Sequence, residues 1–84
     1  MSKVIAAVIR HPELPDTRVT FTKCFAQVED PETGDMMEEP RVSITSKGAS
    51  HGVFRVARYG DDLTRGWVRE FVADNPKCHL VKFA

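Results

Sequence analysis

Cysteine, glycine and proline are all scarce in this chain of 84 residues. It has two cysteines, five glycines and five prolines, whereas 42% of its residues are apolar. These numbers exclude a disulfide-dense, collagen-like or disordered chain and are typical of an ordinary globular protein. The length predicts one domain over residues 1–84, with a modest core that buries roughly 60 to 65% of the surface exposed by the unfolded chain.

Long apolar runs are also missing. The run near the start, Val4 to Ile9, has six residues. It is too short for a membrane span, and the cleavage-site pattern of a secretory signal does not accompany it. We therefore expect a soluble, cytoplasmic protein. In that setting, Cys24 and Cys78 are expected to be reduced, partly buried thiols rather than a disulfide.

Neither sign of charge is in excess, because 12 basic and 12 acidic residues give a net charge of zero. The distribution is uneven, with six acids and no base from Glu29 to Glu39, and six bases and two acids from Arg41 to Arg69. A protein whose main activity is nucleic-acid binding usually carries a basic excess, since each neutralised phosphate releases counterions. The charge balance therefore makes that class less favoured.

Two-residue alternation predicts the first strands. Val4–Arg10 is rich in valine and isoleucine and is followed by two prolines, which stop a strand. Thr17–Glu29 has the clearest alternation in the chain and predicts a long second strand. Phe21 and Phe25 share one side of its pleat, so we expect both to face the core.

The stretch DPETGD, residues 30–35, has the composition of a tight connection. Pro31 is suited to the first central position of a turn, and Gly34 can take a positive φ. We expect a β-hairpin in which the third strand runs from Asp35 to Ser46 beside the second. Pro40 cannot donate to a ladder, so it marks an edge position or a bulge.

A turn of small residues, 47–52, precedes a predicted fourth strand, Val53–Tyr59. After Gly60, Asp61 or Asp62 is expected to cap a helix that ends at Asn75 and Pro76. The apolar residues of this segment form one stripe of an amphipathic helix. They are Leu63, Trp67, Val68, Phe71 and Val72.

The last segment, residues 79–84, is β-prone and predicts a final strand. The order ββββαβ indicates an α+β fold, an antiparallel β-sheet of about four or five strands with one amphipathic helix packed on one face. The second, third and fourth strands are expected to form a meander. The predicted core consists of Phe21, Phe25, Phe54, Val56, Trp67 and Phe71.

Residues that favour catalysis or metal binding are few. Cys24 with His51 or His79 would supply a nucleophile and a base, but a thiol in the middle of an apolar strand more often packs as a small hydrophobe. The same side chains with Cys78 lack the paired spacings of zinc sites. The loop around Lys47 lacks the order of a P-loop. We therefore expect no enzyme activity, no cofactor and no metal.

The acidic hairpin is the predicted binding surface. Clustered carboxylates speed and orient docking on a basic groove of another protein, and two adjacent methionines offer adaptable apolar contact. Equally favoured is a structural role, in which a methionine completes the core and the acids keep an edge strand soluble. The predicted contact residues are Glu29, Asp30, Glu32, Asp35, Met36, Met37, Glu38 and Glu39.

In size and charge layout the chain resembles phage-encoded inhibitors of host defence, which block nucleic-acid-handling proteins by presenting acids. The resemblance implies an inhibitor or adaptor whose partner has a basic groove. It extends to size and charge layout alone and involves no motif.

The alternative is nucleic-acid binding through an arginine-lined sheet face on which Arg41 and Arg55 lie side by side, opposite Phe54. Aromatic side chains are few there, with Tyr59 alone expected to be exposed, and the arginines are more simply read as a solvated face. The residues concerned are Arg41, Arg55, Arg58, Arg65 and Arg69. A homodimer formed through an edge strand, either the first or the last, is a further prediction.

Overall fold

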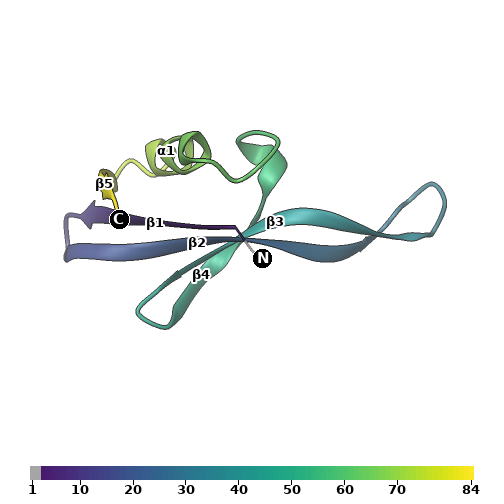
Figure 1. The fold of residues 1–84 in the computed structure, drawn as a ribbon, viewed down its shortest axis with the longest axis horizontal. Helices are drawn as coiled ribbons and strands as arrows, with labels where there is room; N and C mark the ends of the chain where they lie inside the picture. The colour runs from purple at the N-terminus through teal and green to yellow at the C-terminus, as the bar shows by residue number, and fades with distance from the viewer. Residues whose placement is uncertain (1–2) are drawn as a thin grey trace.

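The computed structural model describes residues 3–84, which form one antiparallel sheet with a helical layer on one side (Figure 1). The elements are β1 (Val4–His11), β2 (Leu14–Glu29), β3 (Met36–Ser46), β4 (Ala49–Arg55), the 3-10 helix η1 (Val56–Arg58), α1 (Arg65–Ala73) and β5 (His79–Phe83). Within this part of the chain, no helix has the length and apolar character needed to cross a membrane.

The five strands lie in the order β4-β3-β2-β1-β5, and all neighbours are antiparallel. The predicted α+β class, the order ββββαβ and the meander of the second to fourth strands are confirmed. β1 is paired on both sides over Ala7 to Ile9, and the edge strands are β4 and β5. The prediction that the first strand offers a dimer edge is therefore wrong for this segment.

The core lies between the sheet and the helical layer. We call the sheet surface that α1 covers the helix face and the opposite surface the open face. Strand alternation places Ala7, Phe21, Val42 and Ile44 on the helix face, where all four are buried. They pack with buried residues of the helical layer, namely Val56, Leu63, Trp67, Val68 and Val72.

Trp67 is the centre of this core. Its ring is stacked on Phe71 at 5.6 Å between centroids, and its indole N–H donates to the Val56 carbonyl at 2.9 Å. That hydrogen bond satisfies the one polar group that burial of an indole would otherwise leave unpaired. The predicted burial of Val56 and Trp67 is confirmed.

The fourth strand and the helix differ from their predicted bounds. β4 ends at Arg55, because the chain continues there as η1 and leaves the sheet for the helical layer (Figure 1). The helix begins at Arg65, and its N-cap is Thr64, whose hydroxyl accepts from the Trp67 amide at 3.1 Å. The predicted caps, Asp61 and Asp62, lie ahead of the helix in the preceding loop.

Two aromatic residues lie elsewhere than the sequence predicts. Phe25 does not join the core and is 60% exposed. Tyr59, expected at the surface, is half-buried with its ring edge-on to Trp67. Its hydroxyl donates to the Asp74 carboxylate, which raises the pKa of Tyr59. Tyr59 therefore ties the end of η1 to the end of α1.

Candidate functional site

The β2–β3 hairpin extends well beyond the rest of the sheet (Figure 1). β1 pairs with β2 only as far as Thr22, and β4 pairs with β3 only from Arg41 onward. Residues 24–40, which we call the arm, therefore form a ribbon of two strands, and no other strand of residues 3–84 pairs with either of its edges. The arm gives the molecule its longest dimension, 47 Å against 23 and 21 Å.

The tip of the arm is held by local hydrogen bonds. The Asp30 amide donates to the Asp35 carbonyl, and the Gly34 amide donates to the Asp30 carbonyl, both at 2.8 Å. The Asp30 side chain also accepts from the Glu32 amide at 2.9 Å. Gly34 has a φ of +76°, as its place in the predicted turn requires. The tip is therefore a loop with a defined backbone conformation.

One side of the arm continues the helix face of the sheet without any cover. Register places Phe25 opposite Pro40, Gln27 opposite Glu38, and Glu29 opposite Met36 on this side. Phe25 is 60% and Met36 62% exposed. On this side of the arm, Glu38 and Gln27 thus lie between the two large apolar side chains, and Glu29 lies beside Met36. Sequence reasoning missed Phe25 as a surface residue.

The other side of the arm continues the open face. Met37 lies there opposite Val28 and is 50% exposed, so neither methionine completes the core. Glu39 lies on the same side, and its carboxylate accepts from Arg41 Nε at 2.8 Å and pairs with Arg55 Nε at 3.4 Å. Glu39 therefore belongs to the base of the arm, where two guanidinium groups neutralise it.

The remaining acids of the arm are a separate group. Glu29, Glu32, Asp35 and Glu38 are exposed and Asp30 is partly exposed, and within residues 3–84 none of these five is part of an ion pair. The structure thus gathers all eight predicted contact residues on the arm, and Glu39 differs from the other acids because its carboxylate is ion-paired.

An ion pair marks the point where the helical layer ends and the arm begins. Asp62 Oδ1 lies 2.8 Å from Lys23 Nζ, and Asp62 Oδ2 lies 3.3 Å from Lys3 Nζ. The hydrogen bond from Lys23, with further ones from the Leu63 amide and Lys3, lowers the pKa of Asp62 to about 2. Lys23 Nζ also lies 5.6 Å from the centre of the Phe25 ring. Asp62 therefore fixes the base of the arm to the loop before α1.

The five predicted nucleic-acid-binding arginines do not share one surface. Arg41 and Arg55 are register partners on the open face, as predicted, but both pair with Glu39. Arg58, in η1, lies over Phe54 and Tyr59. Arg65 and Arg69, on α1, lie over Phe83. Nucleic-acid binding stays a prediction.

The predicted cysteine and histidine candidates are also dispersed. Cys24 lies on the open face opposite Arg41, whereas His51 lines a pocket on the helix face. Cys24 and Cys78, both in the described part of the chain, are free thiols. Over residues 3–84, no group of three histidine, cysteine or acidic side chains is placed to hold a metal ion.

Comparisons with protein-family models, with curated proteins and with solved structures found no match for this chain. The geometry and charge of the arm are therefore what bears on its role.

Proposed function

We propose that the protein is a non-catalytic interaction module that docks its arm on a basic surface of another protein, as an inhibitor or adaptor. The observation that carries this proposal is the side of the arm on which Phe25 and Met36 are exposed next to Glu29 and Glu38. Exposed apolar side chains on an isolated ribbon add nothing to the core and are a common mark of an interaction surface.

The charge of the arm specifies the chemistry of the partner. The arm carries the two apolar side chains together with five carboxylates that are in no ion pair within residues 3–84, so a complementary surface has arginine or lysine around an apolar hollow. Charge would orient the encounter, and burial of Phe25 would supply most of the affinity. A basic groove of a nucleic-acid-handling protein has this character.

Affinity capture with the purified protein, in nuclease-treated and untreated lysate, tests the proposal. We expect one protein to be retained after nuclease treatment, and the dissociation constant is then measured with both partners pure. Converting Glu29, Glu32 and Glu38 to Gln should slow association and weaken binding about tenfold, because steering is lost. A triple control, Glu13→Gln, Asp61→Asn and Glu70→Gln, removes the same charge elsewhere and should leave affinity unchanged.

Met36 and Met37 lie on opposite sides of the arm, so matched substitutions of the two residues test which side contacts the partner. Phe25→Ser should cost about 2 kcal/mol or more, roughly 30-fold in affinity, as expected for a central anchor. Met36→Ser should weaken binding more than Met37→Ser, because the two side chains point to opposite sides. Equal effects of the two methionine variants, or retention that disappears with nuclease, would contradict the proposal.

A further inference from the structure

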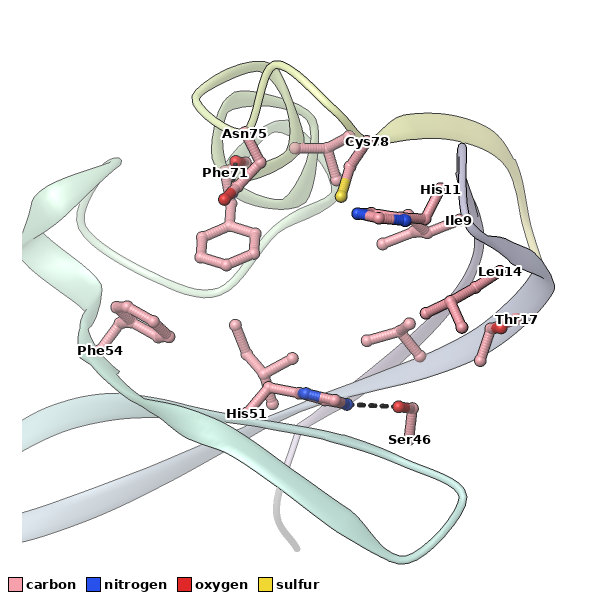
Figure 2. Close-up of a pocket in the computed structure, with 13 residues that line it drawn as sticks. Ile9, His11, Leu14, Thr17, Ser46, His51, Phe54, Phe71, Asn75 and Cys78 are labelled. Atoms are coloured by element: carbon pink, nitrogen blue, oxygen red, sulfur yellow. Dashed lines mark hydrogen bonds between the residues drawn. The ribbon is translucent and has the colours of Figure 1, made fainter.

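A pocket lies at the end of the sheet far from the arm, between the helix face and the end of α1 (Figure 2). Its volume is about 370 Å³. Its apolar wall consists of Ile9, Val19, Ile44, Phe54, Phe71 and Val72. Pockets of roughly 300 to 1,000 Å³ with an apolar wall and a few polar groups are typical of small-molecule sites.

Strand irregularities build this pocket. Ser43 pairs with Val53 and Thr45 with Ser50, so β4 has one extra residue there, next to Gly52 with a φ of +115°. His51 and Phe54 are three residues apart and would face opposite sides of a regular strand. Both nevertheless line the pocket, because the β-bulge turns one of them over.

β2 has a similar β-bulge. Ile9 pairs with Thr17 and His11 with Leu14, so β2 also has one extra residue at this end. Leu14 and Thr17, again three residues apart, both line the pocket. Two bulges that each bring a second side chain to one cavity indicate a shaped site rather than a gap in the packing.

Hydrogen bonds at the pocket leave donors available to a ligand. The Glu13 amide donates to His11 Nδ1 at 3.2 Å, so the neutral His11 ring carries its proton on Nε2 and can donate from there. Ser46 Oγ and His51 Nε2 are hydrogen-bonded to each other (Figure 2). In either tautomer of His51, this pair keeps one unused donor, the Nδ1–H of His51 or the hydroxyl of Ser46.

The charge of the lining specifies the ligand. None of the residues that line the pocket in the described chain is acidic, and two imidazoles stand at it. His51 is exposed and His11 and Ser46 are partly exposed, whereas Ile44 and Val72 are buried, so these polar groups lie toward the mouth and the buried apolar residues toward the floor. The head group is therefore an acceptor, and the body is hydrocarbon.

We propose that this pocket binds a small monocarboxylate with a hydrocarbon body, its carboxylate held by the His11 ring and the Ser46–His51 pair. The pocket volume of about 370 Å³ is at the small end of the range for ligand sites, which favours a ligand on the order of ten non-hydrogen atoms. Octanoate has this size and serves as the probe.

The test is a titration of the full chain with octanoate, in which NMR chemical shifts of the backbone amides report binding. We expect saturable shifts confined to residues around the pocket, such as Ile44, Phe71 and Cys78. His11→Ala and His51→Ala should each weaken affinity about tenfold, because each removes a hydrogen bond to a charged group. His79→Ala is the matched control, since His79 is exposed on β5 and does not line the pocket.

Octylamine and octanol have the same hydrocarbon chain length as octanoate, so they distinguish the contribution of the head group to binding from that of the hydrocarbon body. Octylamine should bind at least about tenfold more weakly than octanoate, because the pocket offers donors to its head and no carboxylate. The proposal is overturned if octanoate at millimolar concentration causes no shifts, or if its shifts lie on the arm. Equal binding of the three probes, or an equal effect of His79→Ala, would overturn it as well. The pocket and the arm lie at opposite ends of β2, so arm variants leave this test unaffected.

Discussion

Asp62 links parts of the chain that are far apart in sequence. The desolvation cost of its carboxylate is low, because the carboxylate is partly exposed. Its pKa of about 2 is set first by the hydrogen bond from Lys23. The unfolded carboxyl titrates near 4, so the pair stabilises the fold fully above about pH 4 and loses its effect as the pH falls toward 2.

Asp62→Asn should therefore lower the melting temperature near neutral pH, and the difference from the parent protein should shrink between pH 4 and 2. Thermal unfolding followed by circular dichroism across this range measures it. Asp61→Asn is the control, because Asp61 is exposed and takes part in no ion pair among residues 3–84. A similar loss in both variants would argue against a specific role for the Lys23 pair.

Residue alternation predicted the direction of side chains but could not predict what covers them. Phe25 is on the same side of β2 as Phe21, as its spacing indicates, yet Phe21 is fully buried and Phe25 is 60% exposed. A helix of nine residues is about 14 Å long, and a strand of 16 residues about 50 Å. Comparison of these lengths is the signal that would have placed Phe25 outside the core.

The helix depends on its N-terminal cap. Two aspartates before Leu63 resemble a cap in the sequence, but Asp62 bonds with Lys23 instead, and Thr64 takes the capping position. Leu63 and Val68, the two positions of a hydrophobic staple around that cap, are both fully buried. The start of the helix is therefore set by the Thr64 cap and its staple, and the long-range pair with Lys23, which local sequence does not reveal, removes Asp62 from the choice of caps.

Thr64→Ala should destabilise the protein by about 1 kcal/mol, because the Trp67 amide loses its acceptor. Urea unfolding at neutral pH measures this change. Thr64→Ser keeps the hydroxyl and should retain most of the stability. If serine proves as destabilising as alanine, the methyl group of Thr64 rather than the cap is responsible.

The β-bulges explain why the pocket could not be predicted. A strictly alternating reading of β4 separates His51 from Phe54, and the same reading of β2 separates Leu14 from Thr17. A bulge residue cannot be recognised from the alternation pattern unless a glycine or another turn residue marks it. Gly52 could have marked this bulge, but it lies in the segment 47–52 that the sequence predicts to be a simple turn. The acidic hairpin, by contrast, was readable because it depends only on local composition.

The whole molecule is elongated. Its radius of gyration is 14.2 Å, whereas a compact domain of this length has about 12 Å. The excess comes from the arm, which carries its acids away from the basic side chains of α1 and β4. The uneven charge of the sequence is thus arranged along the long axis, with the helical layer over one part of the sheet (Figure 1).

Strand order also fixes how the sheet assembles and frays. The β1–β2, β2–β3 and β3–β4 pairs join neighbours in sequence, but Phe83 of β5 pairs with Ala7 of β1 across nearly the whole chain. Closing so long a loop has the largest entropic cost of the four strand pairings. We therefore expect β5 to pair last during folding and to separate first. In hydrogen exchange, the amides of β5 should lose protection well before those around Phe21 in β2. Equal protection of the two strands would mean that the sheet opens only as a whole.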